Sequence, residues 1–320
     1  MAPSESIPNR LHFVWFGEEL PCFAALALKS ARAKNPTATV RLWHEAGLRV
    51  DARVQSLEAA GVERVVLDVG ALLSQTLEQA AAPRALERIW HVLTAPAARS
   101  NVVRLLILYL EGGIYLDTDT LTLQNLDQLR HASAFCGLEH ILWSTARSNK
   151  RHPYYWTAGP LLSGLRLATG YWKEGYRFHG AQLRWYDRAA NNAVLGFTAG
   201  HPFLRRAFTR MGALAEREWT RRYRLGTHLL QELLRTAPPD EAAVRQYPPE
   251  YFYPLGPILS KHYFYERADV VAARARLVPP AAHVLHWYAS VADLAPLDER
   301  YIESHRNTSV YAHLCAPFLP

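Results

Sequence analysis

The chain has 320 residues, a formal net charge of +7 and three cysteines. This length can bury a sizeable core. The cysteines, Cys22, Cys136 and Cys315, are odd in number and widely spaced, which argues against a disulfide framework or a zinc site. No apolar run approaches a membrane span, and the polar first ten residues do not read as a signal peptide, which predicts a cytoplasmic protein. An isoelectric point of about 9.4 favours contact with acidic partners, among them anionic lipid headgroups, but no nucleic-acid-binding signature occurs.

The first hundred residues predict strands alternating with helices. An apolar run over 11–16 predicts a first buried strand. Ligands bind at the carboxyl ends of strands in open α/β sheets, so Trp15 and Phe16 are expected at the rim of a cleft. The next predicted elements are a helix at 21–35, a strand at 38–44, a helix at 51–60 and a strand at 65–69. This alternation is typical of a parallel sheet. A helical insert over 72–93, broken at Pro83, and a loop over 94–100 follow.

The stretch 101–123, NVVRLLILYLEGGIYLDTDTLTL, carries the strongest pattern. Its apolar run over 105–110 predicts a buried helix, and Gly112 and Gly113 supply the left-handed turn that ends one. A short strand over 114–116 then leads into Asp117-Thr118-Asp119. Because side chains alternate along an extended chain, the two carboxylates are expected on one face.

Two adjacent carboxylates raise each other's pKa unless a cation lies between them. Mg²⁺ and Mn²⁺ prefer oxygen ligands and leave further positions to water and substrate phosphates. The Asp117–Asp119 pair therefore predicts a divalent-metal site. The structural alternative, a pair that only ends a strand and starts a turn, is common for an isolated D-x-D.

Beyond residue 121 the pattern is weaker. A short strand and turn at 121–129 precede a strand at 134–140. Residues 154–188 are dense in tyrosine, tryptophan, glycine and arginine without clear periodicity, which predicts loop and short helix. Such rings would offer flat apolar platforms to a ligand, and a structural cover for the core fits equally well.

Arg104 followed by LLILYLEGGIYLDTD resembles the D-x-D block of glycosyltransferase family 32, and also that of the clostridial toxin glucosyltransferase domain. The group includes α-mannosyl-, α-1,4-galactosyl- and N-acetylglucosaminyl-transferases. The resemblance implies an α/β fold of the GT-A type, with a mostly parallel central sheet flanked by helices and helical inserts, forming a single domain over 1–320. It also implies a nucleotide-sugar donor, Mn²⁺ or Mg²⁺ as cofactor, and transfer that retains the anomeric configuration. We assign the aromatic segment 154–188 to the acceptor side, because aromatic rings are natural platforms for sugar faces.

The resemblance also implies the site. Asp117, Asp119 and Arg104 are the expected catalytic residues, and a tryptophan at Trp15, beside Phe16, stacks on the nucleotide base. An asparagine, Asn192 or its neighbour Asn191, binds the donor sugar. A closing segment holds a histidine or serine that completes the metal shell and binds the diphosphate. We expect His286 in the metal shell, with His283 and Ser290 as competitors, and Ser290 among the donor-binding residues.

Three positions depart from the family pattern. Asn101 replaces the usual aspartate one turn before Arg104, where it is implied to touch the donor. Because the two residues are three apart, they share a helix face, and we expect both Asn101 and Arg104 to face the donor. Thr227 replaces a proline that usually follows Gly226. Gly226 is expected at the entrance of a helix, where it would let backbone N–H groups approach an anion. Val291 replaces a tryptophan.

The expected function is therefore a metal-dependent, retaining hexosyltransferase. It would use a nucleotide-sugar, UDP- rather than GDP-linked, and an acceptor hydroxyl on a glycan, lipid-linked molecule or protein, in surface-glycan synthesis. The protein is expected in the cytoplasm, and its basic surface would also allow peripheral contact with the inner face of an anionic membrane. One alternative is a haloacid-dehalogenase-type phosphatase, because YLDTDTL also fits its D-x-D-x-T opening. The chain, however, has neither the G-D nor the D-D dipeptide of that class. A nucleotide-sugar hydrolase and a non-catalytic binding module are the others.

Overall fold

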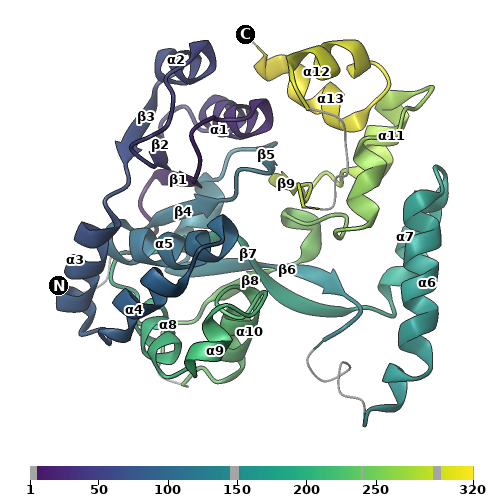
Figure 1. The fold of residues 1–320 in the computed structure, drawn as a ribbon. Coiled ribbons are helices and arrows are strands. Elements are labelled where there is room, and N and C mark those ends of the chain that lie inside the picture. Colours follow the sequence, from purple (N-terminus) through teal and green to yellow (C-terminus); the bar gives the residue numbers. More distant parts are fainter. Residues whose placement is uncertain (1–5, 145–150, 239–240, 291–296, 320) are drawn as a thin grey trace.

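A computed structural model describes residues 6–144, 151–238, 241–290 and 297–319. Its centre is a seven-stranded sheet in the order β3-β2-β1-β4-β7-β6-β8 (Figure 1). The strands are β1 Arg10–Trp15, β2 Thr39–His44, β3 Val62–Val66, β4 Gly113–Leu116, β6 Ala134–Ile141, β7 Asp187–Phe197 and β8 Arg245–Tyr247. All neighbouring pairs are parallel except those that β7 makes with β4 and β6. The predicted α/β fold with a mixed, mostly parallel sheet is confirmed.

Helices cover both faces of this sheet because its central strands are apolar on both sides. Leu11 and Phe13 of β1 pack with α1 Cys22–Lys34 and α2 Ala52–Ala59. Val14, on the opposite face, packs into the cluster that contains the helix α5 Pro96–Glu111. The other helices in that cluster are α3 Val69–Ala80, α4 Ala85–Val92, α8 Pro202–Gly212, α9 Glu216–Trp219 and α10 Thr227–Arg235.

Two further parts extend the molecule. A two-stranded sheet pairs β5 Thr120–Thr122 with β9 Val284–His286. It packs in a separate cluster with the last helices, α11 Val270–Leu277, α12 Glu299–His305 and α13 Val310–Cys315. The helices α6 Ala158–Tyr171 and α7 His179–Leu183 stand at the margin of the molecule, beyond the outer ends of β6 and β7 (Figure 1). Among the described helices, none is both long and apolar enough to cross a bilayer.

Several predicted boundaries were wrong. The predicted loop over 94–100 is mostly the first turn of α5, because Pro96 occupies the first helical position, where its missing N–H costs nothing. The predicted strand over 65–69 is β3 Val62–Val66, and α3 already begins at Val69. Residues 154–188, predicted as loop with short helix, contain the fourteen-residue α6 in addition to the short α7. The prediction also missed β7, an eleven-residue strand.

Candidate active site

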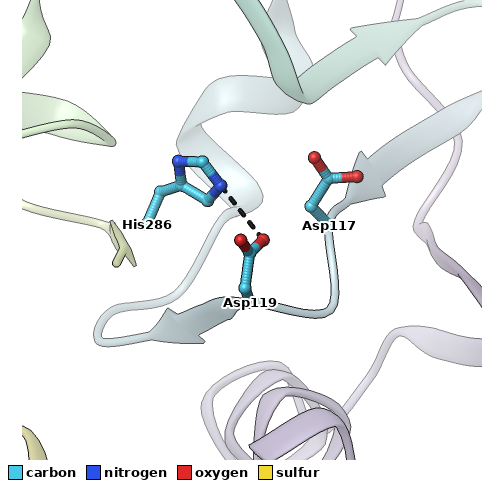
Figure 2. A group of neighbouring side chains, drawn as sticks. All are labelled: Asp117, Asp119 and His286. Carbon is cyan, nitrogen blue, oxygen red and sulfur yellow. Dashed lines mark hydrogen bonds and ion pairs between the residues drawn. The ribbon is translucent and has the colours of Figure 1, made fainter. Parts of the chain in front are cut away.

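Asp117 and Asp119 lie in a tight turn between β4 and β5 (Figure 2). The Asp117 N–H donates to Ala193 O at 2.9 Å, and the Thr120 hydroxyl donates to Asp117 O at 2.6 Å. The two carboxylates share one side of the chain as predicted, but a turn rather than strand alternation places them there. β5 pairs with β9 so that Thr120 lies opposite His286. The side chains of Asp117, Asp119 and His286 each offer one ligand atom, and these atoms lie within 4.8 Å of one another.

Asp119 is held as an ionised carboxylate. Its Oδ1 lies 3.0 Å from His286 Nε2, and its Oδ2 accepts from the Ala289 N–H at 2.9 Å. Burial alone would raise the pKa of this carboxyl, but the charge and hydrogen bond of His286 and the Ala289 N–H outweigh it and lower the pKa. Burial likewise opposes the charge on His286, and Asp119 overcomes it and raises the pKa of the imidazole.

Asp117 has a different environment. Its Oδ1 lies 3.0 Å from Arg104 Nη2 and accepts from the Tyr115 hydroxyl at 2.8 Å. Burial raises the pKa of this carboxyl above its ordinary value; Arg104 opposes that rise, and the neighbouring Asp119 adds to it. The sequence therefore places two close carboxylates in environments that push their pKa values in opposite directions.

Arg104 is buried, with 4% of its surface exposed. It lies over the Tyr115 ring at 4.4 Å. Its Nε donates to Ser100 O at 3.1 Å, Nη2 donates to Ser100 Oγ at 3.0 Å, and Nη1 donates to Asn192 O. The guanidinium thus links α5, β4 and β7 and fixes Asp117. The sequence analysis had instead expected this side chain to face the donor.

Three predicted donor-binding residues come together beside Arg104. Asn192 Nδ2 donates to Asn101 Oδ1 at 2.7 Å. A Cβ on Gly226 would lie 2.9 Å from Asn192 Nδ2 and 3.0 Å from Asn101 Oδ1, so only glycine fits there without a shift. The cavity that these residues line with Leu105 and Leu229 holds about 20 Å³, enough for one water but not for a sugar ring. In this conformation the two amides therefore satisfy each other.

The remaining predicted residues surround this centre. β1 and β4 are parallel neighbours, so Trp15 ends at the same edge of the sheet as Asp117. The Trp15 indole donates to Glu19 O at 2.9 Å, and Phe16 packs against Trp90 at 6.2 Å. Ser290 follows Ala289 and is exposed.

Of the other two residues named in the predicted closing segment, the structure describes one, and it is not part of this centre. His283, the competitor of His286, instead stacks on Tyr251 at 5.1 Å. Val291 lies outside the described residues.

The sequence analysis missed Glu139 of β6 and Tyr288. The Tyr288 hydroxyl donates to Glu139 Oε2 at 2.9 Å, and the Tyr288 ring lies 4.0 Å from the His286 ring. Tyr288 has a positive φ of 58°, an unfavourable backbone conformation for an aromatic residue. Burial raises the pKa of Glu139. A glutamate in an otherwise apolar strand was the signal that could have revealed it.

The residues Asp117, Asp119 and His286 fit a divalent cation. Two carboxylate oxygens and one imidazole nitrogen form a donor set that Mn²⁺ accepts. The two carboxylates lie closer together than like charges favour, and a cation would remove that repulsion. His286 Nδ1 is buried and makes no hydrogen bond within the described part of the chain. The ring is therefore oriented by Asp119 and by packing against Tyr288.

Residues 24–136 match the family described as "Glycosyltransferase sugar-binding region containing DXD motif". This segment contains Asn101, Arg104, Asp117 and Asp119, and it is less than half of the chain. The match confirms the predicted class: the chain carries the sugar-binding region of a DXD glycosyltransferase. No curated protein matches the chain.

Solved glycosyltransferases resemble the chain at low identity. PaToxG glycosyltransferase is 14% identical over 73% of this chain and 70% of its own, with a TM-score of 0.48. The galactosyltransferase LgtC, in complex with donor and acceptor sugar analogues, is 14% identical over 96% and 95% of the chains, with a TM-score of 0.42. The UDP-bound glycosyltransferase domain of the YGT toxin is 15% identical over 65% and 62%, with a TM-score of 0.34. These values are too low to transfer the substrates of those proteins to this chain.

Proposed function

We propose that this protein is a metal-dependent hexosyltransferase that moves a sugar from a nucleotide-sugar to an acceptor hydroxyl and retains the anomeric configuration. The observation that carries the proposal is the grouping of Asp117, Asp119 and His286 within 4.8 Å. Asp117 and Asp119 lie in the turn before β5 and inside the DXD-family segment, whereas His286 belongs to β9, far away in the sequence. A paired carboxylate that only ends a strand would not need a histidine delivered to it from residue 286.

Asp117, Asp119 and His286 would hold Mn²⁺ or Mg²⁺. When bound, the cation would supply positive charge that offsets the charge developing on the diphosphate leaving group. The protein's own contribution is to keep that site preorganised. Ala289 N–H and His286 hold Asp119 ionised, and Arg104 fixes Asp117 through its Oδ1. Trp15 and Phe16, at the same edge of the sheet, would offer aromatic faces to the base.

The donor pocket is proposed around Asn101, Asn192, Gly226 and Ser290. Since Asn101 and Asn192 are hydrogen-bonded to each other in this structure, donor binding would break that bond and turn both amides toward the sugar. The same proposal includes a UDP-linked donor and an acceptor that is a glycan, a lipid-linked molecule or a protein. It also includes a role in surface-glycan synthesis and the action of residues 1–320 as one domain. So is a cytoplasmic location, with contact to an anionic membrane.

A thermal-shift series with UDP, GDP and their sugars, each with Mn²⁺ or with EDTA, tests the proposal. A ligand at about a hundred times its Kd stabilises by about 2.7 kcal/mol, which is readily measured. We expect a shift that requires both the metal and one nucleotide. If no nucleotide shifts the melting temperature, the proposal is contradicted and a phosphatase activity is favoured. Phosphate release from a general phosphomonoester substrate would then test that activity.

A matched pair of variants assigns the effect to the site. Asp119→Asn keeps the size of the side chain but removes the charge, so it should abolish the metal-dependent shift and reduce sugar transfer at least a hundredfold. Asp127→Asn, at an exposed carboxylate paired with Arg130 at 3.0 Å, is the control and should change neither. Transfer at the wild-type rate by Asp119→Asn would rule out the metal site.

A further inference from the structure

Large apolar side chains are exposed mainly in one segment. Of the twelve that are exposed among the described residues, eight lie between residues 156 and 185, and they belong to α6, α7 and the turns beside them. They are Trp156, Leu161, Leu165, Leu167, Tyr171, Trp172, Phe178 and Trp185. We call this segment, residues 156–185, the α6–α7 arm. On α6, Leu161 adjoins Leu165 and Leu167 adjoins Tyr171, because each pair is one helical turn apart. Exposed apolar surface of this kind marks an interaction site.

The exposed face of α6 carries no charge. Its exposed residues are Pro160, Leu161, Gly164, Leu165, Leu167, Ala168 and Tyr171. The only charged residue in the helix is Arg166, which is largely buried near Tyr186; burial lowers its pKa. An ordinary surface helix places polar residues on its outer face, so this outer face is suited to a partner that excludes water.

The inner face of α6 is already occupied by the protein itself. A Cβ on Gly159 would lie 2.5 Å from the Trp143 ring, and one on Gly170 would lie 2.5 Å from Ile258. The Tyr265 hydroxyl donates to Gly170 O at 2.9 Å. The helix therefore cannot turn its apolar outer face inward, and that face stays available.

The segment that carries this apolar face is also rich in positive charge. Residues 151–188 contain six arginines and lysines but only two acidic residues. One of these, Glu174, is already paired with Arg177 at 3.0 Å and Arg267 at 3.4 Å. Lys261 lies 4.1 Å over the Tyr171 ring, and its ammonium donates to the Tyr171 hydroxyl at 2.9 Å.

We propose that the α6–α7 arm docks the protein on an anionic lipid surface. Tryptophan and tyrosine favour the interface between headgroups and hydrocarbon, and each nearby lysine or arginine adds attraction to anionic headgroups. A second copy of the chain fits less well, because a two-fold contact would bring the same positive rims together. The inference concerns the partner of the proposed transferase and places its contact with membranes on this arm; it does not depend on the chemistry at Asp117 and Asp119.

Flotation with phosphatidylcholine vesicles, with and without added phosphatidylserine, tests the docking. Wild-type protein should bind the anionic vesicles and bind less as salt is raised. Leu161→Ser/Leu165→Ser/Trp172→Ser should lower the partition coefficient more than tenfold. The control Val66→Ser/Tyr223→Ser/Val271→Ser, at three exposed apolar positions elsewhere, should leave it unchanged.

A charge pair provides an independent test that does not alter the helix. Lys173→Gln/Arg177→Gln should lower binding to anionic vesicles about fivefold per cation removed, while Arg217→Gln/Arg300→Gln, at exposed positions elsewhere, should not. All these variants should keep the stabilisation by nucleotide and metal, which separates a failure of docking from a failure of the proposed function.

Three results would overturn the docking proposal. In the first, the wild-type protein does not float with anionic vesicles. In the second, the triple serine variant and the Lys173→Gln/Arg177→Gln variant both float as well as the wild type. In the third, light scattering shows a dimer for the wild type and a monomer for the triple serine variant, which would make the arm an interface between copies.

Discussion

Arg104 directs its guanidinium into the protein rather than toward a ligand. Its contacts with Ser100, Asn192 and Asp117 join three segments of the chain. The sequence revealed that an arginine stands at this place in the DXD segment, but helical spacing alone suggested that it shared an outward face with Asn101. The direction could not be predicted because it depends on β7, a strand that the sequence analysis did not identify.

Replacing Arg104 should show this positioning role. Arg104→Gln leaves the partly buried Asp117 carboxylate without its counter-charge, which should lower the free energy of unfolding by about 2 kcal/mol. Urea unfolding measures the loss. Arg104→Lys keeps the charge but not the planar fork, so we expect an intermediate loss.

A second substitution separates charge from packing. Arg104→Gln/Asp117→Asn removes both charges and should recover most of the lost stability, because no unpaired charge remains. The control Arg41→Gln breaks a more exposed pair with Glu111 and Glu63 and should cost about 1 kcal/mol or less. Equal losses for Arg104→Gln and Arg41→Gln would argue against the positioning role.

At the scale of elements, the glycine pair between α5 and β4 sets the direction of the DXD turn. Gly112 has a φ of 64° and Gly113 a φ of 106°. A Cβ on Gly113 would lie 2.7 Å from Arg10 O, and one on Gly112 would lie 2.8 Å from Ala199 N. The pair therefore lets the chain leave the helix with a positive φ at two successive residues while it passes close to the backbone of two neighbouring segments.

Gly113→Ala should consequently lower the free energy of unfolding by more than about 3 kcal/mol, since both the positive φ and the contact with Arg10 O oppose a side chain. The matched control is Gly164→Ala, in the middle of α6, where an added Cβ meets no atom within 4 Å; it should stabilise by about 0.5–1 kcal/mol. Urea midpoints measure both. A loss below 1 kcal/mol for Gly113→Ala would show that β1 and β4 can separate without cost.

The helices and strands that the sequence predicted well are those with local signals. A short apolar run predicted β1, and the longer apolar run and the glycine pair predicted α5 and β4. The sequence analysis did not predict the helix α6 because Pro160 and three glycines interrupt its helical pattern of apolar residues. Two of those glycines are needed for close packing on Trp143 and Ile258. His286 was placed beside the carboxylates only through the family resemblance, because no local pattern predicts the pairing of β9 with β5.

At the scale of the whole molecule, four buried histidines make stability depend on pH. Burial lowers the pKa of His12, His179, His201 and His262 to about 4 from an ordinary 6.5. His12 lies 2.8 Å from Gly112 O through Nε2 and accepts from the Trp43 indole through Nδ1 at 3.1 Å. A second proton on this ring would remove the acceptor that the Trp43 N–H needs.

Acid should therefore unfold the protein between pH 6.5 and pH 4. In that range the unfolded chain binds protons at these histidines and the folded protein does not, so the free energy of unfolding falls as pH falls. His12 alone contributes up to about 3 kcal/mol over the window. Urea unfolding across this range measures the slope. His12→Gln should flatten it, because an amide can accept from Trp43 without titrating, whereas His131→Gln, at an exposed position, should leave it as it is. A wild-type stability that stays constant from pH 6.5 to pH 4 would mean that these histidines take up protons without unfolding the core around them.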